Sequence, residues 1–161
     1  MSRNRSQKPP AESAPAESGE MVVSSQSLLP QQGTPIDRCP TSLDLTTERG
    51  KARAINCMGE ADIVIGDNHM VEMRVCDYLA YPVSTVDEET GEQREYVDLV
   101  LFDEDGHFFK TSSVVAPHKF VAMLRLYGPE RWRAGISIVI AERKARKSGR
   151  TYHELRVIPE E

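Results

Sequence analysis

Residues 96–111 read YVDLVLFDEDGHFFKT, and this stretch decides the fold because it holds two strand signals joined by a tight turn. In its first half, Val97, Leu99 and Leu101 alternate with the residues between them, which is the period-two pattern of a strand with one buried face. The run DEDG then closes a tight turn, and residues 107–111 form the returning strand. The stretch therefore predicts an antiparallel β-hairpin.

On the N-terminal side, the chain predicts one more strand. Apolar and polar residues alternate over 71–75, and the run continues to Val86, with Pro82 marking a bulge, a bend or a sheet edge. Residues 87–92 (DEETGE) form a hairpin loop, whose glycine supplies the positive φ that such connections need. Three consecutive antiparallel strands are therefore expected.

On the C-terminal side, a helix follows. One of the two serines at 112–113 can cap it, Pro117 suits its first turn, an apolar stripe runs over 120–127, and Gly128-Pro129 ends it. Two further strands over 136–140 and 152–158 then flank a basic loop.

A short amphipathic helix over 48–61 precedes the first strand. Five strands with one helix between the third and the fourth is the element order of the OB-fold, a partly open barrel that commonly binds oligonucleotides. The predicted fold class is therefore mainly β, a five-stranded antiparallel OB-fold-like barrel. A different β-barrel and an α+β sheet with the same element order remain as alternatives.

The chain begins with a proline- and serine-rich segment. Its first 40 residues hold six of the ten prolines and few apolar side chains, so they cannot bury enough apolar surface to offset the entropy cost of ordering. We predict a disordered arm over 1–44, which is either a solvated leader or a tail that docks a partner, and a single domain over 45–161.

Several classes of protein are disfavoured. There is no signal-peptide pattern and no run of ~18 apolar residues, so we expect a cytoplasmic protein without membrane contact. The cysteines at 39, 57 and 76 lack C-x-x-C spacing, the histidines lack ligand-like spacing, and DEDG lacks the downstream glutamate of a calcium loop. Neither a Ser- or Cys-centred motif nor a Gly-rich phosphate loop is visible. We therefore predict that the chain is not an enzyme and that it needs no metal or other cofactor.

Charge is distributed unevenly along the chain. The formal net charge is −5, but residues 87–105 hold nine acids and one arginine, whereas residues 106–161 hold eleven basic and five acidic side chains. Such asymmetry indicates an anionic partner.

The side chains opposite the aliphatic alternation are aromatic and basic. If the aliphatic set points inward, the outward set offers a stacking platform, on which each base gains roughly 1–3 kcal/mol. The alternative is that the two phenylalanines of this set pack beneath the helix or the N-terminal segment. The set comprises Arg74, Tyr96, Phe102, Phe108, Lys110, Tyr152 and Arg156, and Trp132 is a further candidate ring.

The loop between the last two strands is strongly basic. Cations at a hairpin tip can hold a phosphate backbone without reading bases, and such binding weakens with salt. A solvated turn is the alternative, but an OB-fold uses this loop for ligand contact, which favours binding. The cations are Arg143, Lys144, Arg146, Lys147 and Arg150.

A family resemblance rests on the order and spacing of several turn-rich motifs. These are TTERGK at 46–51, DEETGE at 87–92, LFDEDG at 101–106, TSS at 111–113, Tyr127-Gly128 with Trp132, and SGRTY at 148–152. Over roughly residues 45–158 the pattern resembles small single-stranded DNA-binding proteins of bacteriophages and mobile elements. The resemblance implies an OB-type barrel that protects single strands in replication, recombination or transfer, without sequence specificity. Many such proteins end in a long acidic tail that recruits partners, whereas this chain ends at Glu161, so the N-terminal arm becomes the alternative candidate for recruitment.

Together these features predict a single-stranded DNA-binding protein, in which the aromatic rings stack on bases and the cations contact phosphates. RNA is an alternative polymer, and replication proteins and a second copy of the chain are candidate partners. A protein-interaction module or oligomeric accessory factor on the same barrel is the main alternative. A duplex-binding regulator is disfavoured because no predicted helix carries a basic recognition face.

Overall fold

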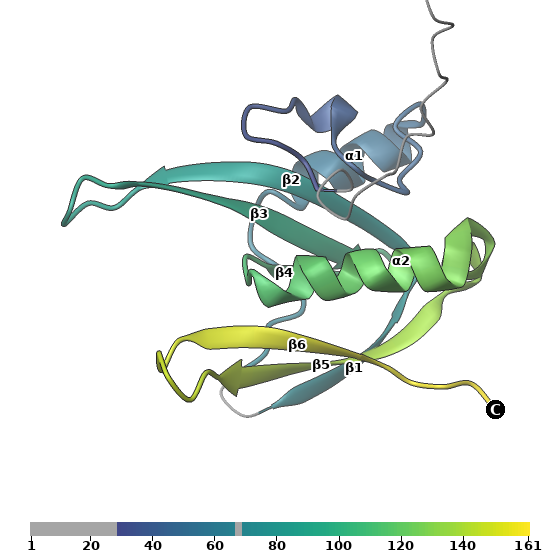
Figure 1. Cartoon of the computed structure of the whole chain (residues 1–161). Coiled ribbons are helices and arrows are strands. Elements are labelled where there is room, and N and C mark those ends of the chain that lie inside the picture. The colour runs from purple at the N-terminus through teal and green to yellow at the C-terminus, as the bar shows by residue number, and fades with distance from the viewer. Residues whose placement is uncertain (1–28, 67–68) are drawn as a thin grey trace, which may run out of the picture.

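The structure, a computed structural model, describes residues 29–66 and 69–161. In this part of the chain, six strands form two antiparallel sheets, and helices cover them (Figure 1). The elements are a 3-10 helix η2 (Ile36–Arg38), α1 (Glu48–Asn56), β1 (Met70–Val75), β2 (Asp77–Val86), β3 (Gln93–Phe102), β4 (Phe108–Thr111), α2 (Val115–Ala134), β5 (Ile136–Lys144) and β6 (Thr151–Val157).

The two sheets have the strand orders β1-β5-β6 and β2-β3-β4. The mainly β class is confirmed, but the five-stranded barrel is wrong. The strand predicted over 71–86 is broken at Cys76 into β1 and β2, because Val75 pairs with β5 whereas Asp77 pairs with β3. A strand that changes partner has to bend where the partners change. Among the described strands β4 and β6 form no ladder, so the barrel is not closed.

Side chains bridge the gap between β4 and β6. Thr111 Oγ1 and His153 Nδ1 lie 2.6 Å apart. The His153 ring also packs edge-on against Phe109, with ring centroids 5.1 Å apart. The two sheets therefore meet here through side-chain contacts in place of a backbone ladder.

Helix α2 covers the main core, which lies between the two sheets. The helix end predicted at 128–129 is present as a break, since Gly128 adopts φ 72° and ψ 169° before the helix resumes. The resumed turn carries Trp132 into the core, where its ring packs against Phe120 and Tyr78. The predicted serine cap is wrong, because α2 begins after Val114 without a side-chain cap.

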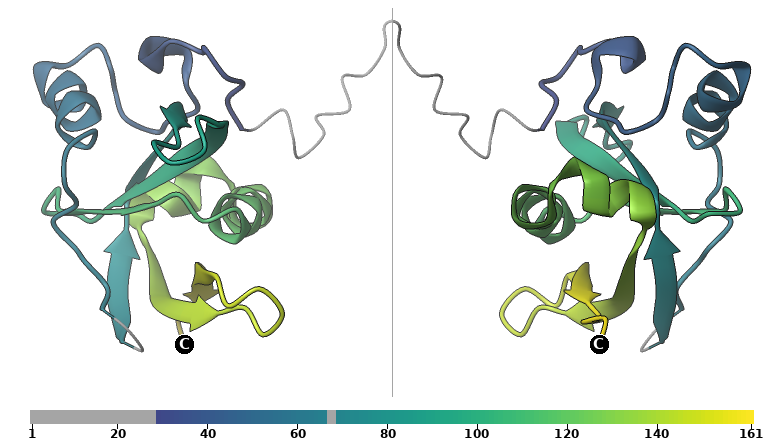
Figure 2. Two further views of the ribbon diagram at one scale, coloured as in Figure 1. Left: turned by 90° about the vertical axis from the view of Figure 1, so that its left-hand side faces the viewer. Right: turned by 90° about the vertical axis from the view of Figure 1, so that its right-hand side faces the viewer.

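A second core cluster lies on the other face of the β2-β3-β4 sheet. Figure 2 shows α1 and the segment before it on this side of the sheet, with α2 and the β5–β6 hairpin on the other side. Thr47 caps α1, and its hydroxyl oxygen accepts a hydrogen bond from Gly50 N at 3.0 Å. Cys39 and Leu43, which the sequence places in the arm, are buried in this cluster. Of the predicted arm, residues 1–28 lie outside the described residues.

In the described ranges, no helix combines the length and the apolar character needed to cross a membrane.

Candidate nucleic-acid interface

The strand register brings four of the predicted site residues to one face. Tyr152 lies directly opposite Arg143 in the β5–β6 ladder, and Arg156 follows on the same side of β6. Arg74 lies opposite Ser137, which has the same parity on β5 as Arg143. Because side chains alternate along a strand and paired residues share a face, all four project from the outer face of the β1-β5-β6 sheet. On the opposite face of these strands, Met73, Ile138, Ile140 and Leu155 belong to the buried core.

Glu154 lies between two of these cations. Its Oε2 atom is 3.2 Å from Arg143 Nε and 3.0 Å from Arg156 Nη2. Hydrogen bonds from Arg156 and then from Arg143 hold the pKa of the Glu154 carboxyl below its usual range, so it is ionised at neutral pH. The predicted site does not include Glu154, although the two-residue spacing from Tyr152 to Glu154 and on to Arg156 already places it on the same face.

The tip of the β5–β6 hairpin is a tight turn that displays cations. Ala145 N donates to Arg150 O at 2.9 Å and Gly149 N donates to Ala145 O at 2.8 Å, while Gly149 takes φ 65°. All four tip cations are exposed, and within residues 29–66 and 69–161 none has a carboxylate at ion-pair distance. The tip therefore presents unneutralised charge. Its cations are Lys144, Arg146, Lys147 and Arg150.

The predicted outward placement of Phe102 and Phe108 is wrong. Their side chains are only 1% and 6% exposed, because α1 and its flanking segment cover this face. The Arg53 guanidinium lies 5.9 Å from the centre of the Phe102 ring and forms a 3.0 Å ion pair with Asp77. The two phenylalanines therefore anchor the N-terminal segment, as the alternative reading of the sequence expects. Trp132 is also buried, at 2% exposure, in the main core.

Lys110 and Tyr96 also belong to the β2-β3-β4 sheet. Lys110 Nζ donates to the carbonyl oxygens of Gly59, at 2.5 Å, and Met58, at 3.4 Å, so it holds the residues that follow α1. Tyr96 is half-buried, and its backbone oxygen accepts from Gln32 Nε2 at 3.2 Å. Neither residue joins the four on the outer face of the β1-β5-β6 sheet.

The acidic turns are explained by turn chemistry. Asp87 Oδ1 accepts from Thr90 N at 3.1 Å, and backbone donors of this kind lower the pKa of the Asp87 carboxyl. Asp103 Oδ1 accepts from His107 N at 2.8 Å in the β3–β4 turn. This turn also brings Asp103, Asp105 and His107 together, with potential ligand atoms within 4.8 Å of one another.

Comparison with known proteins identifies the family. A family model described as Phage Single-stranded DNA-binding protein, of the Phi29 type, matches residues 37–157. Neither the curated proteins nor the solved structures contain a match. The matched range holds both sheets, both α-helices and the basic hairpin, which confirms the resemblance seen in the sequence. The chain belongs to the Phi29-type family of phage single-stranded DNA-binding proteins.

Proposed function

We propose that the chain binds single-stranded DNA through a surface that we call the basic face. The observation that supports this proposal most directly is that Tyr152 and Arg143 lie opposite each other on the outer face of the β1-β5-β6 sheet, next to the unneutralised cations of the hairpin tip. The chain also belongs to a family of single-stranded DNA-binding proteins. Five residues of the predicted site are not part of this face, because they belong to the other sheet or to the core: Tyr96, Phe102, Phe108, Lys110 and Trp132. The basic face comprises Arg74, Arg143, Lys144, Arg146, Lys147, Arg150, Tyr152 and Arg156.

The chemistry of the basic face favours binding without sequence preference. Lysine and arginine neutralise phosphates and release counterions, whatever the bases are. The Tyr152 ring can stack on any base, because every base has a π-face. A protein of this kind would protect single strands in the replication, recombination or transfer of a phage or mobile element, in the cytoplasm. A role in binding and not in catalysis agrees with the sequence prediction.

Salt dependence tests this proposal. Fluorescence anisotropy with labelled oligo(dT) would compare the parent with Lys144→Ala/Arg146→Ala/Lys147→Ala and with a matched control, Arg38→Ala/Arg49→Ala/Lys51→Ala. Each lost phosphate contact reduces the slope of log K against log salt by about 0.7, so the hairpin variant should lose roughly two units of slope. The control removes the same charge elsewhere and should keep the parental slope.

Stacking and polymer type need separate measurements. Tyr152→Ala should weaken binding by roughly 1–3 kcal/mol with little change in salt slope. Competition with duplex DNA and with RNA would show which polymer the protein prefers, and oligo(dA) would test sequence tolerance. Failure of the parent to bind oligo(dT) in low salt would overturn the proposal and favour the protein-interaction module. An unchanged salt slope in the hairpin variant would show that the three hairpin cations do not contact the phosphates.

A further inference from the structure

Two arginines from different elements share one carboxylate at the end of the basic face. Arg74 belongs to β1, and Arg131 lies in the last turn of α2. Glu160, which follows β6, bridges them, since its Oε1 atom is 3.4 Å from Arg74 Nη1 and its Oε2 atom is 2.5 Å from Arg131 Nη2. The predicted site contains Arg74 but neither Arg131 nor Glu160. We call Arg74 and Arg131 the two-arginine site.

The end of α2 holds Arg74 in position. The Nη2 atom of Arg74 donates to the carbonyl oxygen of Ala134 at 2.7 Å, at the helix end where unpaired carbonyl groups attract cations. The next residue is Gly135, with φ 87°, and a Cβ atom there would lie only 2.7 Å from Arg74 Nε. Because Gly135 has no side chain, the guanidinium can lie against the backbone. A side chain that is already fixed in this way loses less conformational entropy when it binds an anion.

Glu160 is a charged and accessible occupant of the two-arginine site. Ile158 N donates to Ser137 O at 2.9 Å, so the chain that leaves β6 is tied to β5 two residues before Glu160. A hydrogen bond from Arg131 and the positive charges of both arginines hold the pKa of the Glu160 carboxyl below its usual range, so it is ionised at neutral pH. The glutamate and both arginines are partly exposed, so another anion can reach them.

A backbone phosphate fits the place of this carboxylate. It also offers two charged oxygen atoms side by side, and the planar donors of arginine bind carboxylate and phosphate alike. Arg74 lies opposite Ser137 on β5, six residues and about 20 Å along the strand from Arg143, so the site continues the basic face. We propose that the two-arginine site binds a phosphate of the nucleic acid, which displaces Glu160. This inference rests on the proposed DNA binding and adds Arg131 to the residues that contact the strand.

Removal of the carboxylate tests the proposal. In fluorescence anisotropy at about 0.15 M salt, Glu160→Gln should bind oligo(dT) roughly two- to fivefold more tightly than the parent, because the phosphate no longer competes with an ion pair. The matched control is Glu161→Gln, which removes the same charge from the next residue. Within residues 29–66 and 69–161, Glu161 forms no ion pair, so its replacement should change the affinity far less. Equal gains in the two variants would overturn the proposal.

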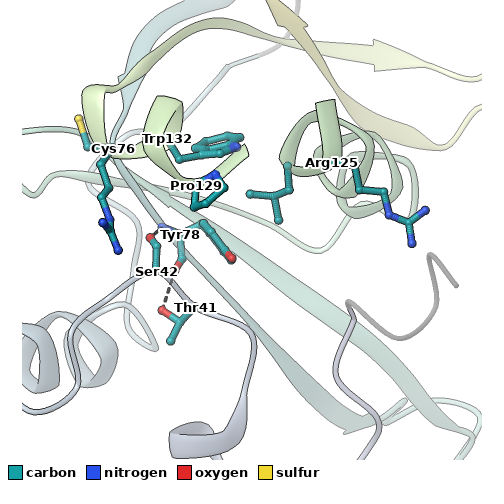
Figure 3. A pocket seen from close by; sticks show the side chains of 9 residues that line it. Thr41, Ser42, Cys76, Tyr78, Arg125, Pro129 and Trp132 are labelled. Atoms are coloured by element: carbon teal, nitrogen blue, oxygen red, sulfur yellow. Dashed lines mark hydrogen bonds between the residues drawn. The ribbon is translucent and has the colours of Figure 1, made fainter. Parts of the chain in front are cut away.

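Arg131 has a control of its own two residues away. Arg133 lines a hollow of about 460 Å³, which Pro129 and Trp132 also line (Figure 3). In the described part of the chain, no carboxylate lies at ion-pair distance from Arg133. Arg131→Gln should therefore remove most of the gain that Glu160→Gln gives, whereas Arg133→Gln should preserve it. A gain that persists in full in the Arg131→Gln background would overturn the proposal.

A measurement without DNA separates this inference from the proposed function. Inorganic phosphate would be titrated into ¹⁵N-labelled Glu160→Gln protein, and NMR would follow the side-chain Nε–Hε signals of Arg74 and Arg131. Both signals should shift, with a phosphate affinity several-fold higher than in Glu161→Gln, where the carboxylate still occupies the site. Such shifts without binding of oligo(dT) would support the anion site and overturn the proposed function. Binding of oligo(dT) without such shifts would overturn the two-arginine site and leave the proposed function standing.

Discussion

At the scale of single residues, Glu154 sets the charge of the basic face. It holds Arg143 and Arg156 in the absence of DNA, so a phosphate has to compete with an ionised carboxylate. Exposed ion pairs contribute about 0.2–1 kcal/mol, so Glu154→Gln should raise the affinity for oligo(dT) roughly two- to fivefold. Fluorescence anisotropy in about 0.15 M salt, where distant charges are screened, would measure this change.

The control for this substitution is Glu88→Gln. It removes the same unit of charge from an exposed position on the β2–β3 hairpin. Affinity should change far less in this variant than in Glu154→Gln. Equal gains in the two variants would show that net charge, and not release of the two arginines, is responsible.

His153 links stability to pH. It is packed against Phe109 and Thr111, and its ring lies 3.8 Å from Glu142, which favours the charged form. Burial outweighs this attraction and lowers the pKa of His153 below its ordinary value of 6.5. Just below pH 6.5, His153 therefore binds a proton in the unfolded chain but stays neutral in the folded chain. The stability that neutral His153 contributes is complete above this pKa and is lost as the pH falls below it.

The measurement is urea unfolding between about pH 7.5 and pH 5.5, a range in which histidine titrates. The parent should lose free energy of unfolding across it. His153→Asn, which keeps a polar partner for Thr111, should lose less. A parallel loss in both proteins would assign the pH dependence to other groups.

The sequence predicts part of the site because the alternation of side chains along a strand shows which residues share a face. Arg143, Tyr152 and Arg156 are found together because period-two spacing and a short hairpin fix their register. Phe102 and Phe108 lie in strands with the same alternating pattern. Their strand sequences do not indicate that a helix some fifty residues earlier in the chain covers their face of the sheet. Which face of a sheet is covered depends on long-range packing, which a strand pattern does not contain.

At the scale of elements, α1 depends on a close backbone approach. A Cβ atom at Gly50 would lie 1.9 Å from the carbonyl oxygen of Asp44, which also accepts from Thr47 N at 3.2 Å. Gly50→Ala should therefore lower the free energy of unfolding by about 1–3 kcal/mol. This loss would occur although alanine is the better helix former by about 1 kcal/mol. Urea denaturation would measure it.

The matched substitution is Gly59→Ala, just beyond α1. There a Cβ atom would meet only Asn56 O, at the ordinary contact distance of 3.4 Å. Its free energy of unfolding should stay close to that of the parent. A neutral Gly50→Ala variant would show that α1 can shift without loss, and that it is a weak cover for the Phe102 ring.

Element types are predicted better than element partners. The hairpin turns, the α2 stripe and the last two strands follow from local patterns. No glycine or proline marks the break at Cys76. The break arises because the residues before it pair with β5, whereas the residues after it pair with β3. Ser112 illustrates the same limit. Its hydroxyl donates to Asp98 at 2.6 Å, a partner on β3, in place of capping α2.

At the scale of the whole molecule, two hairpins of opposite charge project from the same side (Figure 1). The β2–β3 hairpin carries the exposed acids Glu88, Glu89 and Glu92, while the β5–β6 hairpin carries every cation of the basic face except Arg74. An approaching polyanion is therefore attracted by one hairpin and repelled by the other. The balance depends on salt, because the screening length is about 30 Å at 0.01 M ionic strength and about 8 Å at 0.15 M.

Neutralising the acidic hairpin should therefore act on the rate of association. In the variant Glu88→Gln/Glu89→Gln/Glu92→Gln, oligo(dT) should associate several-fold faster than with the parent at about 0.01 M salt, because repulsion over tens of ångströms is removed. Stopped-flow fluorescence should find the two rates converging at about 0.15 M, with little change in dissociation. A gain that persists at the higher salt would instead mean that the acidic hairpin lies against the bound strand, and the basic face would have to extend across the gap between the two sheets.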